Sequence, residues 1–227
     1  LSFTLQAGEK LALVGENGSG KTTLVKLIAR MYDPSEGTIY LDEIDIKKYT
    51  LESYRKLIGV IFQDYVRFSF KAGENIAIGN IDHAEKTTEI EASAGLSLAD
   101  QVINQLPAKY NQMLGKRFAD GVDLSGGEWQ KIALARAYMR DASIVILDEP
   151  TASLDARAEY EVFKRFAELT KGKTAVIISH RFSTVRMADR ILVLKKGELL
   201  EIGSHEQLLA NTGLYHELFS LQAQGYL

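Results

Sequence analysis

Residues 10–31, with the sequence KLALVGENGSGKTTLVKLIARM, contain the stretch that decides the fold. A short apolar run from Lys10 to Val14 predicts a buried strand, and apolar residues at helical spacing from Thr22 to Met31 predict a helix. The segment between them is rich in glycine, which lets the backbone adopt conformations that other residues rarely take. The sequence therefore predicts a strand, a tight loop and a helix in direct succession.

The loop fits the pattern G-x-x-x-x-G-K-[ST], which is typical of a phosphate-binding loop when it follows a strand and opens a helix. Its glycines allow successive backbone N–H groups to point inward at an anion, and the helix adds its positive dipole end. Lys21 can reach the β- and γ-phosphates of a nucleoside triphosphate, and the Thr22 hydroxyl can ligate Mg²⁺. The residues expected to bind the nucleotide here are Gly15, Glu16, Asn17, Gly18, Ser19, Gly20, Lys21, Thr22 and Thr23.

A second polar feature follows a buried strand further along the chain. The apolar run Ile144–Leu147 ends in two carboxylates, Asp148 and Glu149. Open α/β sheets bind their ligands at the carboxyl ends of the strands, so both acids are expected at the site. Asp148 is predicted to face the Mg²⁺, directly or through water, and Glu149 to orient and deprotonate the attacking water.

Residues 124–128, with the sequence LSGGE, are the most specific signal in the chain. Ser125 and Glu128 have capping-box spacing, so a helix with a positive end is expected to begin here. Together with the motifs above, this stretch closely resembles the signature of the ABC ATPases, which implies ATP and Mg²⁺ as ligands and ATP hydrolysis as the activity. In that family two domains pair head to tail. The resemblance therefore implies that Ser125, Gly126, Gly127 and Glu128 close over the ATP of a second domain, an identical copy or a relative.

The signature also departs from the commoner family pattern, since it ends in Glu128 instead of glutamine. A carboxylate beside a triphosphate is unfavourable unless it has another partner. We therefore expect Glu128 to cap its own helix.

The resemblance assigns roles to three further residues. Gln63 matches the glutamine loop of the family, which reaches toward Mg²⁺ and the water and links the site to the membrane partner. Asp155 matches a loop that crosses the dimer interface, although it could also serve as a plain helix N-cap. His180 matches the histidine that touches the γ-phosphate. The implied catalytic set is thus Lys21, Gln63, Glu149 and His180, and the implied metal set is Thr22, Gln63 and Asp148.

Strand patterns alternate with helical ones on either side of a mostly helical middle, which indicates an α/β fold. The expected architecture is a P-loop NTPase of ABC type, with a mostly parallel sheet core, a small antiparallel β part and a helical subdomain. The core is predicted to comprise residues 1–63 and 141–227, and the signature subdomain residues 64–140. Alternating Leu1, Phe3 and Leu5 further predict a strand at the start of the chain.

Several stretches resemble bacterial exporters in which transmembrane helices precede the ATPase, among them residues 74–76, 179–185 and 203–208. The resemblance implies a transmembrane domain fused N-terminally and a position at the cytoplasmic face of the membrane. The aromatic segment Asp64–Phe70 either forms a socket for a loop of that domain or simply packs within the helical subdomain.

Composition and spacing narrow the range of functions. No stretch approaches the roughly 20 apolar residues that a membrane-spanning helix needs. The net charge of −3 gives no reason to expect nucleic acid as a partner, and the lack of cysteine excludes a disulfide framework. A soluble ABC ATPase of DNA repair or chromosome organisation is disfavoured because no sustained heptads separate the two main motifs. The complete set Lys21, Asp148, Glu149 and His180 argues against an ATP-binding module with poor turnover. The ATPase subunit of an importer is an alternative within the transporter class.

Overall fold

The computed structural model describes residues 1–62, 64–118, 120–148, 156–179 and 181–225. By its contacts the chain divides into two compact units. We call Leu1–Val60, Ser143–Pro150 and Thr170–Leu227 the sheet unit, and Ile61–Ala142 with Thr151–Leu169 the helical unit. Residues 156–169, which the sequence assigns to the core, thus group with the helical unit. The predicted domain ranges stay a prediction.

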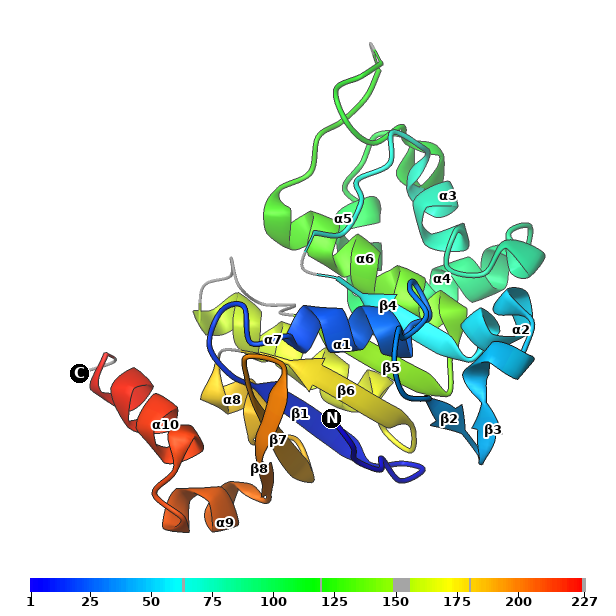
Figure 1. The fold of residues 1–227 in the computed structure, drawn as a ribbon. Coiled ribbons are helices and arrows are strands. Elements are labelled where there is room, and N and C mark those ends of the chain that lie inside the picture. Colours follow the sequence, from blue (N-terminus) through cyan, green and yellow to red (C-terminus); the bar gives the residue numbers. More distant parts are fainter. Residues whose placement is uncertain (63, 119, 149–155, 180, 226–227) are drawn as a thin grey trace. The chain divides into compact units, whose positions relative to one another are not determined.

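The strands of the main sheet follow the order β4-β5-β6-β1-β7-β8, as Figure 1 shows. β1 pairs in parallel with β6 and β7, and β5 pairs in parallel with β6, whereas β8 runs antiparallel to β7. The carboxyl ends of β1 and β5 therefore lie at the same edge of the sheet. The bounds are β1 (Lys10–Val14), β4 (Ile58–Ile61), β5 (Ile144–Asp148), β6 (Thr174–Ile178), β7 (Arg190–Lys195) and β8 (Glu198–Gly203).

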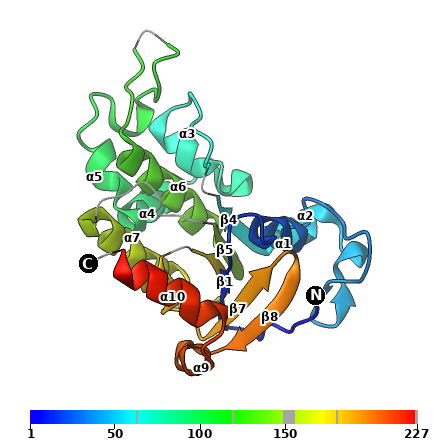
Figure 2. The same cartoon turned by 60° about the vertical axis from the view of Figure 1, so that its left-hand side comes forward.

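Short helices and a small hairpin complete the sheet unit. α1 packs against β6. α9 contacts β8, and α10 packs against α9 (Figure 2). β2 (Tyr40–Leu41) and β3 (Ile44–Asp45) form a separate antiparallel pair, followed by a short 3-10 turn at Ile46–Lys48. The helices are α1 (Lys21–Ile28), α2 (Leu51–Lys56), α8 (Phe182–Val185), α9 (His205–Ala210) and α10 (Leu214–Gln224).

The core of the sheet unit follows from strand alternation. Ala12 and Val14 on β1 pack with residues of β7 and of the C-terminal helices, including Leu208 and Tyr215. Leu11 and Leu13, which point to the opposite face, have no exposed surface. A strand covered on both faces in this way holds the loop that follows it in a fixed position.

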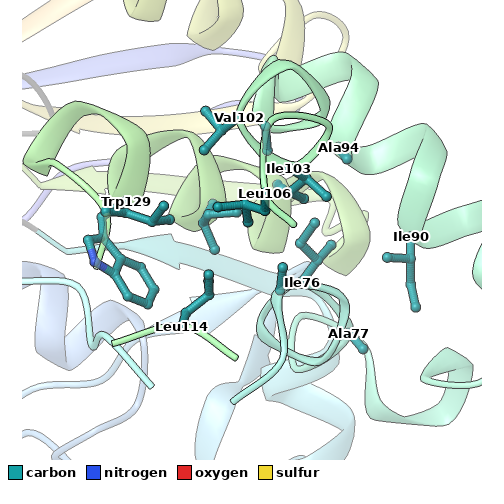
Figure 3. Packing of buried hydrophobic residues seen from close by; sticks show 14 of the residues in the cluster. Ile76, Ala77, Ile90, Ala94, Val102, Ile103, Leu106, Leu114 and Trp129 are labelled. Carbon is teal, nitrogen blue, oxygen red and sulfur yellow. The ribbon is translucent and has the colours of Figure 1, made fainter. Parts of the chain in front are cut away.

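The helical unit is organised around α6 (Gly126–Arg140), which contacts α3, α4, α5 and α7. Its buried residues Trp129, Ile132, Ala135 and Met139 recur at helical spacing and pack into one apolar cluster, seen in Figure 3. The other helices are α3 (Ala72–Ala77), α4 (Thr87–Ser97), α5 (Ala99–Ile103) and α7 (Ala156–Leu169), with short 3-10 turns at Ile81–His83 and Lys109–Asn111.

Most predicted elements are confirmed within one to three residues at their ends. The strand predicted from Leu1, Phe3 and Leu5 is wrong, because residues 1–9 form no strand ladder in the described chain. Alternation makes a strand only where a neighbouring strand supplies hydrogen bonds, and none does so there. Within the described ranges, every helix falls short of the length and apolar character that a membrane crossing would require.

Candidate nucleotide-binding site

The loop between β1 and α1 takes the strained course that its glycines permit. Gly15, Gly18 and Gly20 have φ values of 154°, 76° and 105°, which side-chain-bearing residues rarely adopt. Gly20 is the N-cap residue of α1 and makes no side-chain cap bond, so the positive helix end faces the loop without a competing side chain. We call this curled loop the cradle, because its shape and its open helix start fit an anion; the nucleotide-binding role expected of residues 15–22 stays a prediction.

Lys21 lies across this cradle. Its side chain is buried, and Nζ donates to the carbonyl oxygen of Gly15 at 2.7 Å and to that of Glu16 at 3.1 Å. Ser19 is only 3% exposed, and its hydroxyl has no hydrogen-bond partner within the described part of the chain. A buried ammonium and an unsatisfied hydroxyl in one loop fit an anionic ligand such as a phosphate.

The backbone at and next to the turn between β7 and β8 contacts the phosphate loop. The sequence did not reveal these contacts. The Gly197 N–H donates to the Ser19 carbonyl oxygen at 2.9 Å. A Cβ atom on Gly15 would lie 2.3 Å from the Leu194 carbonyl oxygen, so only glycine fits there. The loop is therefore shaped by close backbone contact as well as by its own glycines.

The predicted metal ligands Thr22 and Asp148 both belong to this edge of the sheet unit. Thr22 is exposed in the first turn of α1, and Asp148 is the last residue of β5, with 6% of its surface exposed. A hydroxyl and a carboxylate are hard oxygen donors of the kind that Mg²⁺ prefers, so the two residues fit the ion.

Four predicted site residues, Gln63, Glu149, Asp155 and His180, lie outside the described residues. A hollow of about 480 Å³ borders the first half of the phosphate loop and is lined by Gly15, Glu16, Asn17, Ser179 and residues of α10. Ser179 immediately precedes His180 in the chain.

The signature residues begin α6 in the helical unit. The Ser125 side chain accepts from the Glu128 N–H at 3.4 Å, and the Glu128 carboxylate accepts from the Ser125 N–H at 2.7 Å. The same carboxylate accepts from the Ser125 hydroxyl at 2.8 Å. The expectation that Glu128 caps its own helix is confirmed, so its carboxylate has hydrogen-bond partners within the helix start.

Because glutamine can accept the same backbone bond, Glu128→Gln is expected to leave ATP turnover within a few fold of that of the unmodified protein. Glu128→Ala removes the acceptor and should lower the free energy of unfolding by about 0.3–1.5 kcal/mol. Steady-state phosphate release and thermal unfolding measure the two effects. A turnover loss in Glu128→Gln beyond about ten-fold would show that the carboxylate itself acts on the nucleotide.

Comparison with known proteins agrees with this geometry. The ABC transporter family model matches residues 1–152, and the chain belongs to that family. Its phosphate loop and signature make it an ATP-binding ATPase domain of the family.

Similar proteins include transport components from several bacteria. The ATP-dependent lipid A-core flippase of Syntrophus aciditrophicus (strain SB) is 46% identical over 98% of this chain and 36% of its own length. The subtilin transport ATP-binding protein SpaT of Bacillus subtilis is 42% identical over 96% of this chain and 36% of its own length. A solved bacterial Atm1-family ABC exporter with ATP bound has a TM-score of 0.89 at 39% identity, over 98% of this chain and 38% of the exporter chain. The chain thus spans little more than a third of these relatives.

Proposed function

We propose that this chain is the ATP-hydrolysing motor of a membrane exporter. The observation that carries the proposal is a pair of separate features in one chain whose geometry fits an anion. One is the cradle at Gly15–Thr22 with its buried Lys21, and the other is the capped helix start at Ser125–Gly127. Similarity to a lipid A-core flippase, a subtilin transport protein and an Atm1-family exporter supports the transport role.

In the proposed mechanism, the cradle binds the phosphates of ATP through backbone N–H groups and Lys21. The helix start at Ser125–Gly127 of a second domain, identical or related, closes over the same nucleotide. Glu149 then orients and deprotonates the water that attacks the γ-phosphate in line, and Gln63 and His180 position water and phosphate. Asp155 lies in the loop that we place at the interface between the two domains.

Thr22 and Asp148, with Gln63, are the residues that would hold Mg²⁺. When bound, this ion would offset the negative charge that develops on the phosphate oxygens. Hydrolysis removes the γ-phosphate that bridges the two domains, and the pair then reopens. ATP binding and hydrolysis would thus switch the pair between a closed and an open state.

We further propose that a transmembrane domain, fused before this chain, places it at the cytoplasmic face of the membrane. The segment Asp64–Phe70 supports both interpretations of its aromatic residues. The Phe68 ring lies under the Arg136 guanidinium. It also stacks on the Phe70 ring, with 5.3 Å between the two ring centres. Phe70 itself is 44% exposed. Phe70 also lines a hollow of about 370 Å³ with Ile78 and Ile81. Phe68 thus serves packing, and Phe70 is the candidate contact for a membrane-domain loop.

Phosphate release by the intact purified protein tests the function. We expect saturable hydrolysis with Mg-ATP, on the order of 1 s⁻¹ or faster, and its loss when EDTA removes the metal. Thermal unfolding with and without Mg-ATP provides an independent measure of binding. A protein that neither releases phosphate nor gains stability from Mg-ATP would rule out the proposal.

A further inference from the structure

The segment that follows Gln63 is tied directly to the first turn of the signature helix. The Tyr65 hydroxyl donates to the carbonyl oxygen of Gly126 at 2.8 Å. Gly126 is the first residue of α6 and immediately follows the N-cap residue Ser125. The hydrogen bond therefore joins a side chain two positions after Gln63 to the part of the signature that is proposed to contact ATP.

A second tie joins the same segment to the same helix further along. Arg136 donates from Nη1 to the Val66 carbonyl oxygen at 2.6 Å, and its guanidinium lies 5.2 Å from the centre of the Phe68 ring. Arg136 also donates from Nε to the Asn75 carbonyl oxygen at 2.8 Å and from Nη2 to the Asn75 side-chain oxygen at 2.6 Å. One guanidinium thus fixes both this segment and helix α3, which carries Asn75.

Asn75 completes this second tie from the other side. It is fully buried, and its side-chain nitrogen lies within hydrogen-bond distance of the carbonyl oxygens of Phe68, Phe70 and Lys71, at 3.1–3.2 Å. The backbone of residues 66–71 is therefore held at several points by two side chains that bond to each other. Such a satisfied polar network favours one arrangement of the segment over others.

Stability alone does not explain this network, because desolvation of the Arg136 guanidinium has a free-energy cost. Burial lowers the pKa of Arg136 to about 10, because the guanidinium loses water. The guanidinium is half-buried and donates to amide oxygens, which compensate a partly desolvated charge less well than a carboxylate does. A well-packed apolar residue at this position would avoid that cost. The arrangement is better explained by the fixed geometry that it imposes.

We infer that Tyr65 and Arg136 are positioning residues, which hold the signature helix and the segment after Gln63 together as one body. Gly126 and Arg136 are ten residues apart on α6, about 15 Å along the axis. Because α6 is packed on several sides, the ties constrain the segment: a single tie would let residues 65–71 pivot about one point, whereas two ties at this separation fix the segment against the helix in both position and direction. A displacement of residues 65–71 then displaces Ser125–Gly127 by the same amount. This inference rests on the proposed function, because it assumes that those residues contact ATP.

Tyr65→Phe tests the first tie, since it removes one hydroxyl and keeps the ring. Tyr138→Phe is the matched control, because the Tyr138 hydroxyl also donates to a backbone carbonyl oxygen, that of Arg165, at 2.8 Å. Both tyrosines are half-buried, and burial raises the pKa of each, in Tyr138 to about 12. Tyr138 lies on the same helix but twelve residues beyond Gly126.

In the intact protein, Tyr65→Phe is expected to lower kcat about five-fold, which corresponds to roughly 1 kcal/mol, while Tyr138→Phe leaves kcat unchanged. Both variants should lose similar thermal stability, and both should bind Mg-ATP to the phosphate loop with unchanged affinity. Equal kcat values in the two variants would overturn the inference. If the unmodified protein hydrolyses no ATP, the proposed function has failed instead, so the two failures are distinguishable.

Arg136→Lys tests whether the two ties act together. The change keeps the charge but cannot reproduce the forked hydrogen bonds. In that background, adding Tyr65→Phe is expected to lower kcat less than about two-fold, because a segment already released at one tie gains little from the other. An undiminished five-fold effect would show that the ties act independently and would refute the two-point arrangement. Should Arg136→Lys not fold, the comparison of Tyr65→Phe with Tyr138→Phe decides alone.

Discussion

Replacement of Glu149 by glutamine is expected to lower ATP hydrolysis by about 100-fold or more, because a general base contributes 10²–10⁴-fold to rate. Glutamine has nearly the same shape as glutamate but cannot accept a proton from water. Binding of Mg-ATP should survive, since the cradle and Lys21 are unchanged. With hydrolysis blocked, the two domains should stay closed around the nucleotide, and size-exclusion chromatography with Mg-ATP should show a persistent pair.

Glu128→Gln is the matched control for this experiment, because it makes the same chemical change at a carboxylate that caps a helix. The control should hydrolyse ATP nearly normally and reopen after each turnover. Undiminished phosphate release by Glu149→Gln would remove the assigned role of Glu149. A pair that forms equally well without nucleotide would mean that ATP does not bridge the two domains.

The phosphate loop and the main strands could be predicted because their determinants are local. The glycine spacing of residues 15–20 fixes the loop, and the apolar run that begins at Ile144 marks a strand whose residues 145–147 are buried. The capping box at Ser125 and Glu128 is likewise a short-range pattern, and it forms as the spacing requires. Even the unusual Glu128 could be explained before its contacts were known, because a carboxylate three residues after a serine has a defined partner.

Contacts between residues distant in the sequence could not be predicted in the same way. Nothing near Gly197 indicates that its N–H supports Ser19, and Tyr65 gives no sign that it reaches Gly126, 61 residues later. The strand predicted from the apolar alternation at Leu1–Leu5 is wrong for the same reason. Strand pairing depends on a second strand, and the alternation of one segment contains no information about that partner. Helical periodicity correctly identified the middle of the chain as helical, but only the packing shows that α6 is its central helix.

Lys21→Met is expected to weaken Mg-ATP binding by about 10–100-fold, as loss of a hydrogen bond to a charged group costs ~1.5–3 kcal/mol. Methionine keeps much of the buried stem but carries no charge to offer the phosphates. Hydrolysis should fall at least as far, because the same ammonium would stabilise charge that develops during transfer. Titration calorimetry and phosphate release measure the two losses. Lys26→Met is the matched control. Lys26 lies in the last turn of the same helix α1, and its replacement also removes one positive charge.

Stability measurements separate a binding defect of Lys21→Met from damage to the fold. Burial of the Lys21 ammonium has a desolvation cost, and methionine avoids it while leaving the carbonyls of Gly15 and Glu16 without this donor. The two effects oppose each other, so the nucleotide-free variant should unfold within about 1 kcal/mol of the unmodified protein. Ligand at about 100 times its Kd adds roughly 2.7 kcal/mol to the unmodified protein. At the same concentration the variant, whose Kd is about 10–100-fold higher, should gain only about 0.4–1.4 kcal/mol. A variant that Mg-ATP stabilises as strongly as it does the Lys26→Met control would show that Lys21 does not contact the phosphates.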